Sequence, residues 1–143
     1  MTEYNEPFFR LYENLFLVLK QDLGKRKALK LFRKVMEKGL KEAFDSMGFQ
    51  KGNPQDFARI IGERESSLGL DTRFPEVSEN KIVYQFHRDP IPNLKGHVDN
   101  QKIDKTYMKF KVRYLLGKDW GYRTTKHIWY GDKFTEHVNR KKG

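Results

Sequence analysis

The chain has 143 residues, a length that fits one domain. With 37% hydrophobic and 14% aromatic residues it has enough apolar side chains for a packed core, which excludes a chain that is disordered throughout. It contains no cysteine, which excludes disulfide bonds, a thiol nucleophile and a cysteine-based zinc site. No stretch approaches the roughly 20 apolar residues of a membrane span, and the acidic start lacks the features of a signal peptide. We therefore expect a cytoplasmic protein with no membrane partner.

The net charge of +10 is distributed unevenly along the chain. Residues 1–80 are nearly balanced, whereas residues 81–143 carry 15 Lys and Arg against 6 Asp and Glu, a net charge of +9. A basic half of this kind fits an anionic partner, which is nucleic acid, a membrane surface or an acidic small molecule. A solvated basic face with no specific partner explains the same composition.

Three helices are predicted in the first half of the chain. Apolar residues recur at helical spacing over residues 7–22 and, as a broader stripe, over residues 25–48. A glycine follows each stretch and a proline opens the first, as is typical of helix ends and starts. Asn53 before Pro54 is typical of a helix cap and first turn, which predicts a third helix to about Ser67.

The pattern changes after Gly69. Residues 81–88 alternate between two faces, which predicts a strand that a proline-rich segment then breaks. Residues 99–116 return to helical spacing. Two closing strands are predicted at about residues 120–130 and 133–139.

This order of elements predicts an α+β fold. We expect N-terminal helices packed on a small antiparallel sheet, with one further helix before a C-terminal β-hairpin. The prediction is one domain over residues 1–143, mainly helical over 1–69, with strands, one helix and the closing hairpin over 70–143.

The closing hairpin carries the candidate catalytic residues. Gly131-Asp132 could form a two-residue type II′ turn with glycine first. In that register His127 faces Glu136 across the strands, beside Trp129. A carboxylate raises the basicity of a neighbouring imidazole and fixes its tautomer, so His127 is the candidate general base and Glu136 the residue that orients it. A structural cross-strand pair at a sheet edge accounts for the same arrangement.

The candidate ligand-binding residues come from three places. His97 and Asp99 stand at the start of the predicted fourth helix, where free amide groups favour an anionic ligand, although Asp99 also suits a simple helix cap. Arg123 is the candidate partner of a ligand carboxylate. The others are His87 at a strand end, Trp129 in the hairpin and His137 on the opposite hairpin face from His127.

Several common site motifs are missing from the sequence. There is no HxxxH or HExxH pair, so no metal site is predicted. The glycine-rich motifs of nucleotide-binding proteins and the Gly-x-Ser-x-Gly turn of α/β-hydrolases are also missing. The sequence names no cofactor.

The predicted fourth helix also has the ingredients of a nucleic-acid interface, because cations can contact phosphates and aromatic rings can stack on bases. Its tyrosines, however, fall on the apolar stripe, where they would be core residues. The residues concerned are Lys102, Lys105, Tyr107, Lys109, Lys111, Arg113, Tyr114 and, just beyond it, Lys118.

Three features carry a resemblance to a known family. They are Leu23-Gly24 between the first two helices, the strand end Phe86-His87-Arg88-Asp89-Pro90, and the close from Gly131 to His137. With these the chain resembles the L-2-amino-thiazoline-4-carboxylic acid hydrolase-like family, and the vinyl-reductase-like ligand-binding domains end in a similar Gly-Asp hairpin. The family commonly has cysteines where this chain has His87, His97 or Val98, and Thr135.

The resemblance implies an α+β domain with a pocket between helices and sheet, and hydrolysis of a cyclic C–N bond. If the family's thiols serve catalysis, this chain has lost the activity or uses other groups. The preferred hypothesis is therefore a protein that binds, and in the catalytic version hydrolyses, a small anionic molecule. The alternatives are a nucleic-acid-binding module that uses the basic half, and a non-catalytic ligand sensor that forms a homodimer through its helices.

Overall fold

A computed structural model describes residues 3–143. Three helices open the chain and two strands, a helix and two further strands follow them, so the predicted α+β fold is confirmed. Two single-turn 3₁₀ helices, η1 (Pro92–Leu94) and η2 (Ile128–Tyr130), lie in the connections. The main elements are α1 (Glu6–Leu23), α2 (Lys25–Met47), α3 (Pro54–Ser67), β1 (Thr72–Val77), β2 (Lys81–Phe86), α4 (Asn100–Leu115), β3 (Trp120–Lys126) and β4 (Thr135–Lys141).

The helices α1, α3 and α4 begin where a short polar side chain accepts an amide hydrogen. Asn5 accepts a hydrogen bond from the backbone amide of the third residue of α1, and Asn53 and Asp99 cap α3 and α4 in the same way. Gly24, with φ of 84°, joins α1 directly to α2 in a conformation that favours glycine. The helices of residues 3–143 all fall short of the length and apolarity that a membrane crossing requires.

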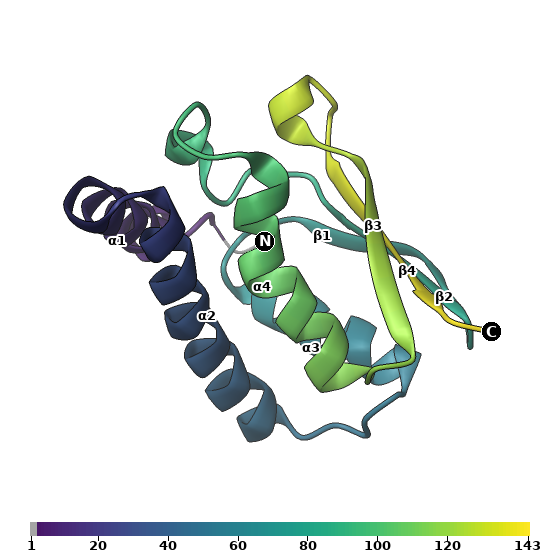
Figure 1. Cartoon of the computed structure of the whole chain (residues 1–143). Coiled ribbons are helices and arrows are strands. Elements are labelled where there is room, and N and C mark those ends of the chain that lie inside the picture. The colour runs from purple at the N-terminus through teal and green to yellow at the C-terminus, as the bar shows by residue number, and fades with distance from the viewer. Residues whose placement is uncertain (1–2) are drawn as a thin grey trace.

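The sheet is fully antiparallel, with strand order β1-β2-β4-β3. In Figure 1 the four helices lie on one side of it, with α3 and α4 nearest the strands and α1 and α2 farther away. Strand alternation fixes which side chains face the helices. Ile82, Tyr84 and Phe86 of β2 are buried on the helical side, so Val83 and Gln85 point to the opposite, outer face of the sheet.

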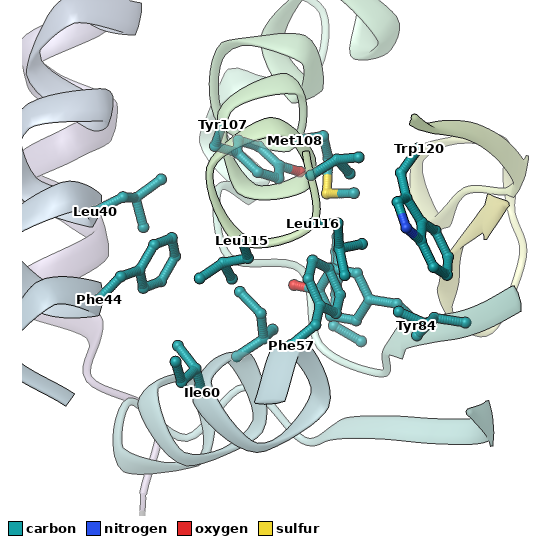
Figure 2. Close-up of a cluster of buried hydrophobic side chains, with 14 residues drawn as sticks. Leu40, Phe44, Phe57, Ile60, Tyr84, Tyr107, Met108, Leu115, Leu116 and Trp120 are labelled. Atoms are coloured by element: carbon teal, nitrogen blue, oxygen red, sulfur yellow. The ribbon is translucent and has the colours of Figure 1, made fainter. Parts of the chain in front are cut away.

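Two groups of buried apolar side chains hold the layers together. The larger group lies between the sheet and the helices and includes Phe44, Phe57, Tyr84, Met108 and Trp120 from five different elements (Figure 2). A second group joins the α1–α2 pair to η1 and the start of α4, and it includes Phe16, Phe32, Leu94 and Ile103. A cavity opens between the two clusters.

The predicted two-residue hairpin turn is wrong. β3 ends at Lys126 and β4 begins at Thr135, and residues 127–134 form a loop that contains η2. The Asp132 carboxylate accepts the His127 amide hydrogen at 2.9 Å, and the Thr135 hydroxyl accepts that of Ile128 at 3.2 Å. These amides bind side chains instead of the opposite strand, so the ladder stops before the predicted turn.

Candidate ligand-binding site

A cavity lies between the α1–α2 pair and the layer formed by α3, β2 and α4. Its volume is about 80 Å³. One water needs roughly 10–15 Å³ measured in this way, so the space can admit part of a small ligand. Most of its wall is aromatic or aliphatic, from Phe8, Phe9 and Tyr12 of α1, Phe32, Met36 and Leu40 of α2, and Leu68, Leu70, Phe86, Pro90 and Ile91 on the other side.

A buried polar cluster interrupts this apolar wall. The Lys111 ammonium donates to the Glu65 carboxylate at 2.7 Å and to the Tyr84 hydroxyl oxygen at 3.2 Å. The Tyr84 hydroxyl in turn lies 2.5 and 2.6 Å from the two carboxylate oxygens of Glu65, and Thr72 donates to Glu65 at 2.8 Å. Burial, and then the negative charge of Glu65, raise the pKa of Tyr84 well above its ordinary value. Its hydroxyl therefore stays protonated and serves as a donor.

Charged side chains such as these are unusual at core positions. The Lys111 and Glu65 side chains are each only 7% exposed. Taking two charges out of water costs several kcal/mol per ion, and an apolar pair of similar volume is often equally stable. Buried charge on the wall of a cavity is, in contrast, a common feature of binding sites. We therefore regard this cluster as the centre of the candidate site.

A second cation lies on the same wall. Arg64, next to Glu65 in α3, is half-buried and lines the cavity. Among residues 3–143, no carboxylate lies within 4.0 Å of its guanidinium. Arg64 and Lys111 against Glu65 give the wall one net positive charge.

A further buried chain of hydrogen bonds extends behind the cavity wall. Tyr107, whose ring lines the cavity, donates its hydroxyl hydrogen to Asp104 at 2.8 Å. The other Asp104 oxygen lies 2.9 Å from His127 Nε2. His127 Nδ1 accepts the Trp129 amide hydrogen at 3.0 Å, so the imidazole carries its proton on Nε2 and donates it to Asp104. Both ring nitrogens of His127 are thus engaged.

The predicted cross-strand pair of His127 with Glu136 is wrong. Lys126, not His127, lies opposite Glu136, and the loop turns the His127 ring towards Asp104 inside the protein. Glu136 points to the outer face of the sheet, where it accepts hydrogen bonds from Thr125 at 2.6 Å and Gln85 at 2.7 Å. A catalytic role of either residue stays a prediction.

The outer face of the sheet brings together some other predicted site residues. His87 Nε2 lies 3.0 Å from the Gln85 side chain that also binds Glu136, and its ring stacks on Phe134. Burial lowers the pKa of His87. Arg123 is exposed on the same face, opposite Val138. These residues are separated from the cavity by the sheet itself.

His137 and Trp129 are held inside or at the edge of the domain. His137 is fully buried among the rings of Tyr84, Phe86 and Tyr122, with Nδ1 2.9 Å from the Thr124 hydroxyl. Its Nε2 has no hydrogen-bond partner among the described residues, and burial lowers its pKa to about 4. The Trp129 indole donates to Asp89 at 2.6 Å.

The residues predicted at the start of the fourth helix have structural contacts. Asp99 accepts the Gln101 amide hydrogen at 3.1 Å, so it is the helix cap. His97 is exposed, and its backbone oxygen accepts a hydrogen bond from Lys20 at 2.7 Å. None of the predicted site residues belongs to the described residues that line the cavity.

The sequence prediction missed the residues that do surround the cavity, although a signal was present. Asp104 and Lys111 occur within the apolar stripe of α4, each one turn away from the buried Tyr107. Glu65 stands one turn after Ile61 on the buried side of α3. A charged residue at an inward position of an amphipathic helix is uncommon and marks a buried polar cluster.

The nucleic-acid prediction for the fourth helix is wrong for Lys111, which is buried and cannot contact a phosphate. Tyr107 is buried too, as expected of a tyrosine on the apolar stripe. Within residues 3–143, moreover, no three His, Cys, Asp or Glu side chains gather in a way that could hold a metal ion.

No protein-family model matches this chain, and no curated protein matches it significantly. The resemblance to the L-2-amino-thiazoline-4-carboxylic acid hydrolase-like family therefore stays a prediction.

Proposed function

We propose that the protein binds a small, mainly apolar carboxylate in the cavity between the α1–α2 pair and the α3–β2–α4 layer. The observation that carries the proposal is the buried cluster of Glu65, Tyr84 and Lys111 on the wall of an otherwise apolar cavity. Ligand sites commonly combine an apolar lining with a few convergent polar groups.

The charges of the site indicate how the ligand lies. Its apolar part would pack against the aromatic residues of α1 and α2, and its carboxylate would face Arg64. Arg64 can bind a carboxylate with two parallel hydrogen bonds. Lys111 has three N–H donors and uses two of them on Glu65 and Tyr84, so one remains for a ligand oxygen.

The same contacts support binding rather than hydrolysis. A general base needs a free lone pair near the reacting atom. Glu65 already accepts hydrogen bonds from Thr72, Tyr84 and Lys111, and both nitrogens of His127 are engaged. Hydrolysis of a cyclic C–N bond stays a separate prediction, which replacement of His127 by Ala would test in an assay of turnover.

The proposal is tested with matched ligands. Aromatic and medium-chain carboxylic acids should raise the melting temperature and bind in calorimetry, and their methyl esters should bind more weakly. Arg64→Gln should lower affinity for the acids by about tenfold or more, because a charge-assisted hydrogen bond is worth roughly 1.5–3 kcal/mol. Arg123→Gln removes an equal charge from the outer sheet face and should leave binding unchanged.

A third variant locates the ligand. Leu68→Trp enlarges a half-buried side chain on the cavity wall and should abolish acid binding. Full acid affinity in this variant, or an equal loss in the Arg64 and Arg123 variants, would contradict the proposal.

A further inference from the structure

Helices α2 and α4 lie side by side and run in roughly the same direction (Figure 1). The rings of Phe44 and Phe110 stack between them with centroids 6.4 Å apart. Near the helix ends, the Tyr114 hydroxyl binds Asp45, and the Lys41 ammonium lies 5.7 Å from the Tyr114 ring centre. These contacts fix how each helix is rotated about its axis.

The solvent-facing side of α2 carries a continuous row of lysines. Their spacing of three or four residues places them on one side of a helix. Each is exposed, and the buried residues Phe32, Leu40 and Phe44 lie on the opposite side. The row consists of Lys27, Lys30, Lys34, Lys38 and Lys41.

Helix α4 carries a second row of cations with the same spacing. Its inward side holds Asp104, Tyr107 and Lys111, and Phe110 contacts α2, so the remaining side is exposed to solvent. This second row consists of Lys102, Lys105, Lys109 and Arg113, all exposed. The two rows come together at one end, since Lys41 of the first row lies over the ring of Tyr114, the residue that follows Arg113 of the second row. We call the two rows together the basic face.

The charge of the basic face is largely uncompensated. Helix α2 alone has 8 Lys and Arg against 3 Asp and Glu. Among residues 3–143, Lys41 is the member of the basic face that has a carboxylate partner, Asp45 at 2.7 Å. Like charges four residues apart, such as Lys30 with Lys34 and Lys105 with Lys109, destabilise a helix by roughly 0.2–0.5 kcal/mol per pair. A polyanionic partner would remove this repulsion.

We infer that the basic face binds the sugar–phosphate backbone of double-stranded nucleic acid. Residues three or four apart rise about 4.5–6 Å along a helix, and a phosphate occurs roughly every 3.4 Å along each strand, so phosphates are spaced closely enough for each cation of a row to reach one. The large exposed apolar residues are Leu11, Val18, Leu23, Val35 and Tyr130, and none belongs to either row. The Tyr114 ring beside Lys41 is already stacked on Phe110, with centroids 4.9 Å apart. Among residues 3–143 the rows therefore offer no free ring for an unpaired base and no apolar anchor for a membrane.

The binding test uses fluorescently labelled duplexes of about 20 base pairs, one of DNA and one of RNA, in anisotropy titrations at about 50 and 200 mM salt. The wild-type chain should bind at least one duplex, with affinity that falls steeply as salt rises. Lys34→Gln/Lys105→Gln/Lys109→Gln should weaken binding about tenfold or more. It should also reduce the slope of log affinity against log salt by about 0.9 for each lost phosphate contact.

The control variant has the same net charge as the variant of the rows but loses its cations from another surface. Arg123→Gln/Lys126→Gln/Arg140→Gln removes three exposed cations from β3 and β4 and should change affinity less than about twofold. Circular dichroism should show both variants folded, because all six substituted residues are exposed. The substitutions in the rows also relieve like-charge repulsion. Absence of duplex binding at low salt, equal losses in the two variants, binding to single strands alone, or binding to phosphatidylserine vesicles but not duplex would each overturn the inference.

Discussion

At the scale of single residues, the most consequential feature is a charge pair placed in the core. Glu65 is satisfied by three donors, and Lys111 is held between Glu65 and Tyr84. Each buried charge is therefore compensated by the other. Removing one partner leaves an uncompensated buried charge, whereas removing both does not.

Glu65→Gln is accordingly expected to lower the free energy of unfolding by roughly 3–5 kcal/mol, since Lys111 loses its counter-charge. Adding Lys111→Met to this variant should restore most of the stability, because methionine fills a similar space without a charge. Urea denaturation of the single and double variants measures both effects. If the double variant is less stable than Glu65→Gln, the instability of the single variant does not come from an uncompensated charge on Lys111.

At the scale of elements, α4 combines three separate surfaces. Its inward side carries Tyr107 and Lys111 to the cavity, its side chain Phe110 packs on α2, and its exposed side forms half of the basic face. The start of the helix therefore sets the positions of the cavity wall, the contact with α2 and the basic face. That start is fixed by Asp99, which accepts the Gln101 amide hydrogen.

Asp99→Ala should lower the free energy of unfolding by about 1 kcal/mol, the usual effect of losing a helix cap. Asp99→Ser should retain nearly full stability, because serine also caps helices. Thermal unfolding followed by circular dichroism distinguishes the two variants. Equal stability of all three proteins would show that the cap does not hold α4 in place, and loss of carboxylate binding in the stable Asp99→Ser variant would give Asp99 a role in the ligand site.

At the scale of the whole molecule, the sheet and helix layers bury a histidine that cannot easily become charged. His137 lies between the layers, and burial lowers its pKa from 6.5 to about 4. Between these pH values the unfolded chain binds a proton that the folded protein does not. The free energy of unfolding should therefore fall as pH falls from about 6.5 to about 4, by up to roughly 1.4 kcal/mol per unit, and level off below that range.

His137→Gln should remove this contribution and give a shallower pH dependence over the same range. Asp89, whose pKa burial raises, contributes with the opposite sign, but it is present in both proteins and its effect cancels in the comparison. Urea denaturation at several pH values measures the difference. Parallel curves for wild type and variant would show that His137 is not the group responsible.

Local periodicity was sufficient to predict most of the fold. The helices predicted at 7–22, 25–48 and 54–67 agree with α1, α2 and α3 to within one residue, and the α+β class is confirmed. This success has a physical basis, because caps, glycine ends and apolar stripes act within a few residues of each other. The C-terminal hairpin itself is present, but its predicted two-residue turn is wrong, because Asp132 and Thr135 bind amides that a regular ladder would have used.

By itself, the sequence determined which segments become helices and strands, and that the chain carries an excess of positive charge. Only the tertiary structure decided where that charge and the buried polar groups lie. Glu65, Tyr84 and Lys111 come from α3, β2 and α4, and the two cationic rows come from helices in different halves of the chain. Contacts between such distant segments depend on how the layers pack, and no local pattern contains that information.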